Sequence, residues 1–399
     1  MKYDFDEIID RRNTNAQNVE GWRPYIFKCG PDKKFPFADD EFIRMWVADM
    51  EFAVAPEIRQ AIKDRVDRKI LGYTGIFGTE YYNAFRRWCL ERYAWEFPQE
   101  ELAFSPGVIP ALYQLVEDIV KPAGGKVLTL SPSYGHFLHA CTYNNVELVC
   151  SPLRLTEAGF EIDFADLAAK AKDPAVKMLI FCNPHNPTGR MWSQQELEKV
   201  AAIVHENELW VVSDEIHCDL LRCGNRHIPL AKVMADYPFI ATCMSASKTF
   251  NLAGLCFSNV IIRDADERRR FRKRLKTGGD VNPLSLTAHQ AAYEQGGDWL
   301  EELKIYLDDN LKLVRNFLDV NIPSAGFHIP EATYFAWIDL RKTLPDAGDL
   351  PLYFANKAGV LLEGGNSLFV DNAEGFVRLN LAMPRVLIAE ALNRIGGAI

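Results

Sequence analysis

The feature that most constrains the fold is a regular alternation of short apolar runs with amphipathic segments between about residue 100 and residue 262. The apolar runs, each of the length of one buried strand, cover residues 126–130, 146–150, 176–182, 209–213, 239–245 and 256–262. Between two of them, Ser193 and Glu196 have the spacing of a capping box, and Leu197, Val200 and Val204 follow on one helical face. Strands that alternate with helices form βαβ units. The pattern therefore predicts an α/β fold with a mostly parallel sheet.

The length of 399 residues allows one large domain and one smaller domain. After about residue 285 a long helical stretch is followed by shorter strand-like pieces at residues 334–340 and 375–381, which is typical of a smaller α+β domain. The first 49 residues have no strong periodicity and contain three prolines, so we expect an arm that wraps another surface. The expected division is an arm with part of the small domain in 1–49, a large ligand-binding domain in 50–287 and a C-terminal small domain in 288–399.

Two turns that follow predicted strands carry residues suited to a phosphate and to a flat ring. In residues 105–110, Gly107 permits close approach of the backbone, and Pro110 suits the first position of a helix, whose free N–H groups cradle phosphate. In residues 131–135, Tyr134 stands where its face can stack on a planar heteroaromatic ring. Each turn alone is more often an ordinary connection, so the weight lies in their combination.

Two further features place polar side chains after predicted strands. Residues 183–190 contain two Asn-Pro steps, a density of rigid turn chemistry that indicates side-chain amides aimed in fixed directions. Asp214 ends an apolar strand, where a carboxylate is costly to bury unless a cation lies beside it. A protonated pyridine nitrogen is such a cation, and Asp214 would keep it protonated. Ligands of open α/β sheets bind at this carboxyl edge of the strands.

Lys248 lies among hydroxyls and small residues in the stretch 245–255, directly after the apolar run 239–244. An amine attacks a carbonyl only when it is neutral, so a partly desolvated pocket suits a lysine that forms a Schiff base. The neighbouring serine hydroxyls could bind a phosphate. Most lysines are solvated surface groups, and the three upstream segments are what favour a catalytic role here.

Charge and hydropathy restrict the partners of the chain. A formal net charge of -9 repels phosphate backbones, so we expect no nucleic-acid partner. The basic run at residues 267–276 is interpreted as a solvated helix face, because no aromatic residues interleave with its charges. The acidic start of the chain and the absence of any run of 18 apolar residues predict a soluble protein that has no membrane span and is not exported.

Nine scattered cysteines, with no C-x-x-C pair, indicate the reducing compartment and argue against two kinds of site. An odd number without paired spacing disfavours a disulfide framework, and the same spacing disfavours a zinc site. We therefore expect a cytoplasmic protein without a bound metal.

These segments together resemble the fold-type I enzymes that depend on pyridoxal 5′-phosphate, the aspartate aminotransferase superfamily, over nearly the whole chain. More narrowly, they are similar to the MalY/PatB group of cystathionine β-lyases and C-S lyases. The segments that carry this likeness are residues 45–50, 72–75, 183–190, 213–217, 245–255 and 378–382. The resemblance implies a large domain with a mostly parallel sheet and a smaller α+β domain.

The resemblance also implies which residues surround the cofactor ring. Lys248 would carry the Schiff base, Asp214 would bind the pyridine nitrogen, and Asn186 would bind the ring oxygen. Tyr134 would stack on the ring and count with Lys248 and Asp214 as a catalytic residue. His217 would lie near the ring oxygen, where many aminotransferases have a tyrosine.

The phosphate and the substrate have their own implied contacts. The phosphate would be held by the amides of Val108 and Ile109, by Ser245 and Ser247, and by Tyr73 from a second subunit. Arg378 would bind the substrate α-carboxylate, a bidentate task that lysine performs poorly, and Asn186 and Trp46 would also contact the substrate. Because Tyr73 is useful only in a neighbour's site, the resemblance implies a homodimer with shared active sites.

Two positions depart from the family pattern. Cys256 stands in the region where the superfamily often has a phosphate-binding arginine, and Glu51 stands where related lyases commonly have aspartate. His136 and His139 lie near Tyr134 and are compatible with acid–base chemistry, although a structural or surface role is more common for such residues.

The function implied is α,β-elimination of L-cystathionine or a related cysteine S-conjugate to pyruvate, ammonia and a thiol. The substrate is a small amino acid, and the freed Lys248 acts as the general base that removes its α-proton. An aminotransferase is the alternative within enzymes, since both reactions begin with the same proton removal. A lyase that doubles as a regulatory binding protein is the alternative from another class.

Overall fold

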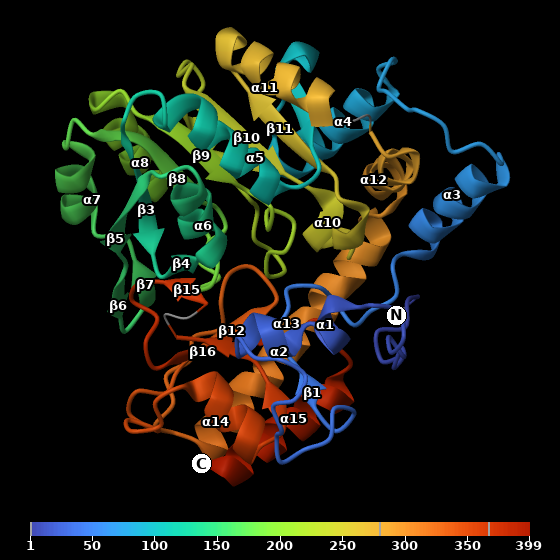
Figure 1. Cartoon of the computed structure of the whole chain (residues 1–399), viewed down its shortest axis with the longest axis vertical. Coiled ribbons are helices and arrows are strands. Elements are labelled where there is room, and N and C mark those ends of the chain that lie inside the picture. The colour runs from blue at the N-terminus through green and yellow to red at the C-terminus, as the bar shows by residue number, and fades with distance from the viewer. Residues whose placement is uncertain (1, 279–280, 366–367) are drawn as a thin grey trace.

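The computed structural model describes residues 2–278, 281–365 and 368–399, and its centre is a seven-stranded sheet (Figure 1). The strand order is β2-β11-β10-β9-β8-β3-β5. In the order of the sheet, these strands are β2 (Leu102–Ser105), β11 (Ser258–Ile262), β10 (Ile240–Met244), β9 (Trp210–Asp214), β8 (Val176–Cys182), β3 (Lys126–Ser131) and β5 (Glu147–Pro152). Only β11 runs antiparallel to its neighbours. The predicted α/β fold with a mostly parallel sheet is confirmed.

Both faces of this sheet are covered, which explains why its strands read as continuous apolar runs. Along β8, Met178, Ile180 and Cys182 pack into one hydrophobic cluster, whereas Leu179 and Phe181 pack into another on the opposite face. This alternation follows from the two-residue period of a strand. The covering helices include α5 (Val108–Leu115), α6 (Gly135–Tyr143), α7 (Phe164–Ala171), α8 (Gln194–Glu206), α9 (Leu230–Val233) and α11 (Ala265–Gly278). Helix α8 begins with the predicted capping box of Ser193 and Glu196.

A second, smaller assembly lies below the large sheet in Figure 1. Its three-stranded antiparallel sheet consists of β12 (Phe335–Asp339), β16 (Phe376–Asn380) and β14 (Glu363–Gly364), with β16 in the middle. Helices α14 (Leu350–Lys357) and α15 (Arg385–Ala398) pack beside it. The 25-residue helix α13 (Gly297–Asn321) follows α12 (Pro283–Gln295) and contributes to the hydrophobic clusters of both assemblies.

The N-terminal segment joins the two assemblies. It contains α1 (Gln17–Glu20), α2 (Trp22–Ile26) and β1 (Ile43–Arg44), and β1 pairs in parallel with β13 (Val360–Leu361) of the smaller assembly. Short pairs also connect β4 (Ser133–Tyr134) with β15 (Phe369–Val370) and β6 (Arg154–Thr156) with β7 (Gly159–Glu161). The β4–β15 pair ties the turn that carries Tyr134 to the smaller assembly.

Residues 68–79 run along the outside of the molecule between α3 (Pro56–Asp67) and α4 (Glu80–Tyr93) (Figure 1). Tyr73 and Phe77 in this segment are 99% and 96% exposed. Large apolar side chains left this bare usually mark a surface that another molecule covers. Among the described residues, no helix combines the length and apolar character that crossing a membrane requires.

Candidate active site

A cavity of about 230 Å³ opens at the carboxyl ends of β8, β9 and β10. The sheet brings together there the ends of strands that are far apart in the sequence, as expected for a ligand site of an open α/β fold. Eight of the twelve predicted site residues line it: Val108, Ile109, Tyr134, Asn186, Asp214, His217, Ser247 and Lys248. The polar motifs that follow the strands therefore meet in one place.

Lys248 lies in the short helix α10 (Ala246–Thr249), directly after β10. Its Nζ donates a hydrogen bond to the carbonyl oxygen of Ala48 at 2.7 Å, and Tyr334 Oη donates to the same oxygen at 2.9 Å. Asn380 holds this segment by donating to the carbonyls of Val47 and Asp49. The amine is thus aimed by fixed backbone.

Burial lowers the pKa of Lys248 to about 8, although Asp49 pulls it upward. Removing a cation from water disfavours its charged form, and a pKa near neutrality leaves a substantial neutral fraction. A neutral amine is the form that attacks a carbonyl or accepts a proton. The site therefore meets the chemical requirement that the sequence suggested for this lysine.

Asp214 is the last residue of β9 and is 4% exposed. Burial raises the pKa of its carboxyl to about 7, opposed by the hydrogen bond from the Ile216 amide at 3.2 Å. No cationic side chain in the described part of the chain lies within ion-pair distance of it. A protonated ring nitrogen in the cavity would supply the missing charge.

The start of α5 forms one end of the cavity. Gly107 is the N-cap, and Val108 and Ile109 present the free N–H groups of the first turn. Pro110 therefore occupies the third helical position, and its predicted place at the first position is wrong. The first turn lacks intrahelical acceptors for its N–H groups, so proline is tolerated throughout it.

The two serines before Lys248 have different roles. Ser245 is the N-cap of α10: its Oγ accepts from the Ser247 amide at 3.1 Å and donates to the Phe257 carbonyl at 2.7 Å. Ser247 lines the cavity. Ser245 lies outside the lining, so its predicted phosphate contact stays a prediction that its own hydrogen bonds disfavour.

Cys256 also lines this end of the cavity, in a left-handed conformation with φ of 49°. Among the lining residues that the structure describes, Lys248 is the one with a formal positive charge. Amide and hydroxyl groups are thus the phosphate donors that the chain itself offers here.

Arg378 lies next to the cavity and is 1% exposed. Its Nη1 donates to Asn186 Oδ1 at 3.0 Å and its Nη2 to the Trp46 carbonyl at 3.2 Å, while Glu363 forms an ion pair with Nη2. The Trp46 side chain is fully buried, and its indole N–H donates to the Asn18 carbonyl at 3.1 Å. The Trp46 carbonyl therefore binds Arg378, whereas the Trp46 side chain does not line the cavity.

Tyr134 and His217 both line the cavity. The Tyr134 ring is 5.0 Å from the ring of His136. Burial drives the pKa of His217 well below its usual value, so the imidazole is neutral, and its Nδ1 has no partner among the described residues. A neutral imidazole with a free nitrogen can hydrogen-bond a polar ring substituent.

The family described as aminotransferase class I and II matches residues 41–395. This chain belongs to that family. Within it, the chain is 37% identical over 366 residues to cystathionine beta-lyase PatB of Bacillus subtilis (strain 168), covering 91% of this chain and 94% of the relative. It is 30% identical to protein MalY of Escherichia coli (strain K12), covering 100% of this chain and 99% of the relative.

Solved structures of C-S lyases superpose on this chain over nearly its whole length. The PLP-bound C-S lyase from Staphylococcus hominis, complexed with L-cycloserine, superposes with a TM-score of 0.95 at 46% identity, covering 99% of this chain and 98% of that chain. Cystalysin from Treponema denticola, whose structure contains pyridoxal 5′-phosphate, superposes with a TM-score of 0.92 at 33% identity, covering 100% of this chain and 99% of that chain. The chain is a fold-type I enzyme of the MalY/PatB group, and the resemblance inferred from its motifs is confirmed.

Sequence reasoning missed two residues of this aminotransferase-family site. Tyr334 shares the Ala48 carbonyl with Lys248, and Glu363 pairs with Arg378. Glu363 had a detectable sequence signal, because it is an acid directly after the apolar run 358–362. In the structure it is 4% exposed. Tyr334 had none, because tyrosines at strand edges are common.

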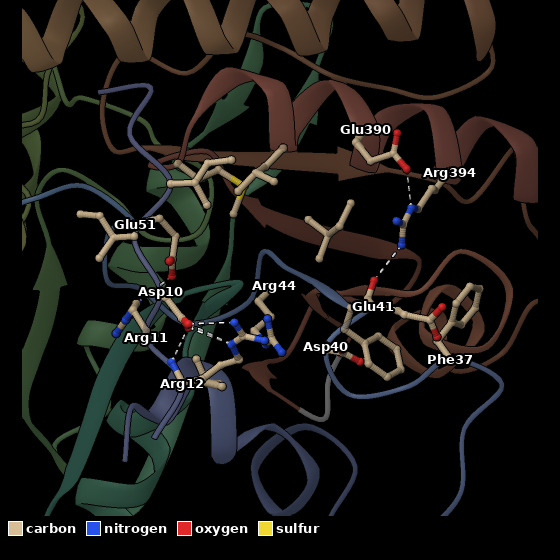
Figure 2. Close-up of a pocket in the computed structure, with 17 residues that line it drawn as sticks. Asp10, Arg11, Arg12, Phe37, Asp40, Glu41, Arg44, Glu51, Glu390 and Arg394 are labelled. Atoms are coloured by element: carbon tan, nitrogen blue, oxygen red, sulfur yellow. Dashed lines mark hydrogen bonds and ion pairs between the residues drawn. The ribbon is translucent and has the colours of Figure 1, made fainter. Parts of the chain in front are cut away.

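A larger cavity of about 530 Å³ lies elsewhere, between the N-terminal segment and α15 (Figure 2). None of the predicted site residues lines it. Glu51 lies at its edge, where it forms an ion pair with Arg11 at 2.7 Å, and Arg11 also pairs with Asp49 at 2.6 Å. Glu51, at the position where related lyases commonly have aspartate, therefore helps to hold the N-terminal segment against the loop that carries Ala48.

Proposed function

We propose that this protein is a pyridoxal 5′-phosphate-dependent carbon-sulfur lyase that eliminates the β-substituent from L-cystathionine or a related cysteine S-conjugate. The products are pyruvate, ammonia and a thiol. The observation that carries the proposal is the meeting of Lys248 and Asp214 in one cavity, each with a pKa shifted toward neutrality by burial. The relatives named cystathionine beta-lyase and C-S lyase supply the reaction class.

The described residues fit this cofactor. Asp214 is a buried acid with no ion-pair partner in the described part of the chain, the start of α5 and Ser247 offer phosphate donors, and desolvation lowers the pKa of Lys248 to about 8. When bound, pyridoxal 5′-phosphate supplies a carbonyl for amines and a ring that accepts the electrons of the broken Cα–H bond. The protein supplies binding, orientation and proton transfer.

The residues of the chain then divide the work of elimination. Arg378 binds the substrate α-carboxylate, and Asn186, which already accepts from Arg378, links that site to the cavity. Lys248 Nζ takes the α-proton, and its pKa near 8 lets it give the proton up again. Asp214, which is 4% exposed, would bind the protonated ring nitrogen of the cofactor and stabilise its positive charge.

The proposal is tested by following pyruvate from L-cystathionine with purified, cofactor-saturated protein and no keto acid. Sustained, multiple-turnover pyruvate release is expected. The rival is an aminotransferase, and a putative aminotransferase from Clostridium difficile 630 is 34% identical with a TM-score of 0.90. Activity that stops after one turnover and resumes only when a keto-acid acceptor is added would establish that rival instead.

We further propose a cytoplasmic homodimer in which Tyr73 completes the phosphate site of the partner. The support is the exposed segment 68–79, in which Ile70, Tyr73 and Phe77 are 75%, 99% and 96% exposed. Tyr73 does not line the cavity of its own chain. A tyrosine that serves a phosphate must therefore reach a second subunit. The nine free cysteines suit a reducing compartment.

A further inference from the structure

Glu363 and Arg378 form a direct cross-strand pair. In the antiparallel ladder of β14 and β16, Glu363 stands opposite Arg378, so both side chains leave the same face of the sheet. Both residues are buried, at 4% and 1% exposure. The backbone register, and not a chance rotamer, places the carboxylate against the guanidinium.

The contacts of Arg378 already neutralise the positive charge that a second carboxylate would need. Its Nη atoms donate to Asn186, to the Trp46 carbonyl and to Glu363, and the guanidinium carbon lies 4.1 Å from the centre of the Phe335 ring. Its Nε is buried and has no partner in the described part of the chain. A guanidinium has five N–H donors, so an incoming carboxylate can still find donors, but the positive charge is already neutralised.

The surroundings of Glu363 are mainly cationic or neutral. The cations that lower the pKa of Glu363 are Arg378 first and then Lys248 and Lys28. The charge of Glu363 in turn raises the pKa of the Tyr25 and Tyr134 phenols. Burial nevertheless raises the pKa of Glu363 above its usual value. The carboxyl is therefore predisposed to take up a proton when a further negative charge arrives.

We propose that Glu363 is a specificity-determining residue that competes with the substrate α-carboxylate for Arg378, so that carboxylate binding is coupled to the uptake of one proton by Glu363. This inference rests on the role given to Arg378 in the proposed function. Two carboxylates on one buried guanidinium repel each other, and protonation of one of them relieves the repulsion. The arriving carboxylate then takes the full charge of Arg378.

The consequence for substrate choice is that the group at this position must be an ionised carboxylate, because a neutral group would not displace Glu363 from Arg378. By linkage, proton uptake on binding means that binding weakens as pH rises above the pKa of Glu363. The same ion pair keeps Arg378 compensated when no substrate is present, which avoids an unpaired charge in the interior.

The test uses the cofactor-loaded protein and 3-(methylsulfanyl)propanoate, which keeps the carboxylate of S-methylcysteine but lacks the amine that would react with the cofactor. Calorimetric titration in two buffers with different ionisation enthalpies gives the number of protons taken up. Wild type is expected to take up about one proton, and its Kd is expected to rise about tenfold per pH unit once Glu363 is ionised. Binding by wild type without proton uptake overturns the proposal, whatever any variant does.

The variant Glu363→Gln keeps the shape and a hydrogen-bond acceptor but removes the charge. It is expected to bind the probe at least tenfold more tightly at pH 8, without proton uptake. Wild-type affinity and wild-type proton uptake in this variant would also overturn the proposal. The matched control is Glu267→Gln, a buried glutamate paired with Arg270 on α11, which is expected to leave both quantities unchanged.

Two further arms separate this inference from the proposed function. Arg378→Gln is expected to abolish probe binding, and retained binding would overturn the role of Arg378 itself. Pyruvate release from L-cystathionine by wild type reports on the lyase reaction independently of proton uptake. An aminotransferase would show the same coupling at Glu363, so a negative pyruvate result leaves the Glu363 test intact.

Discussion

Two ionisable residues of the cavity, the partly buried Lys248 and the buried Asp214, carry the proposed chemistry at the scale of single side chains. Burial lowers the pKa of Lys248 to about 8 and raises that of Asp214 to about 7. Each group is therefore held in an environment that disfavours its usual charged form, which costs folding stability. Such perturbed pairs are characteristic of functional sites, because catalysis at neutral pH needs groups that exchange protons there.

The reactivity of Lys248 should follow its lowered pKa. We expect the rate at which the cofactor-free protein takes up pyridoxal 5′-phosphate to rise with pH and to level off above a midpoint near 8, because the neutral amine dominates above the pKa of about 8. Stopped-flow absorbance in the visible range measures this rate. A midpoint close to 10.5, the ordinary lysine value, would contradict the account.

Replacing Asp214 should stabilise the cofactor-free protein while removing its activity. The carboxyl ionises near pH 4 in the unfolded chain but near pH 7 in the folded one, so the folded state loses stability as pH rises from about 4 to 7. Asp214→Asn keeps an acceptor for the Ile216 amide and cannot ionise. Urea unfolding should show a gain that grows from pH 5 to pH 8 and reaches roughly 2–4 kcal/mol. An equal or lower stability at pH 8 would mean that the carboxylate is not disfavoured by burial.

The helix α10 shows how one short element combines folding and binding. Ser245 caps the helix with its hydroxyl, and Ser247 turns toward the cavity one residue before Lys248. Mutation of Ser245 is therefore expected to affect folding stability, and mutation of Ser247 is expected to affect cofactor binding. Helix capping by Ser245 and the proposed phosphate binding by Ser247 are thus divided within a single turn.

We expect Ser247→Ala to weaken cofactor binding about tenfold, since a hydrogen bond to a charged group contributes about 1.5 kcal/mol, and to leave the Tm of the cofactor-free protein unchanged. Ser245→Ala is the matched comparison: loss of the cap should lower the free energy of unfolding by about 1 kcal/mol. Fluorescence titration gives the Kd, and thermal melts give the stability. Unchanged cofactor affinity in Ser247→Ala would remove this residue from the phosphate site.

The elements were predictable from sequence where local signals and tertiary packing agree. The apolar run 176–182 is β8 to the residue, because every residue of this strand except Lys177 is buried. The start of α5 was misplaced by two residues, because Gly107, not Ile109, caps it. The pairing of Glu363 with Arg378 could not be predicted, since β14 has two residues and its register with β16 is set by tertiary contact. The intrinsic β-propensity of a residue does not predict which residue lies opposite it on a strand that is distant in the sequence.

At the scale of the whole molecule, the exposed segment 68–79 carries Tyr73, a proposed phosphate contact that does not line the cavity of its own chain. The cavity gathers donors from the large assembly, and Arg378, proposed to bind the substrate carboxylate, comes from the smaller one. Tyr73 points to neither, since it is 99% exposed. In the proposed homodimer, a second copy of the chain would bring Tyr73 to the phosphate.

Mixing two inactive variants tests this arrangement. Lys248→Ala lacks the amine, and Tyr73→Ala lacks the contact with the partner's phosphate. After unfolding and refolding together, a mixed dimer should hold one complete site, which gives roughly a quarter of wild-type activity for equal amounts. Each variant refolded alone is the control. No recovery, with dimers confirmed by light scattering, would show that Tyr73 does not serve the partner's site.

The central claim is that Lys248 is the residue that holds the cofactor covalently. Reduction of the loaded protein with borohydride fixes a Schiff base permanently, and peptide mapping by mass spectrometry then locates the attached group. The account predicts a single modified peptide carrying the pyridoxyl group on Lys248. Attachment to a different lysine in the wild-type protein, or no attachment at all under cofactor saturation, would contradict it.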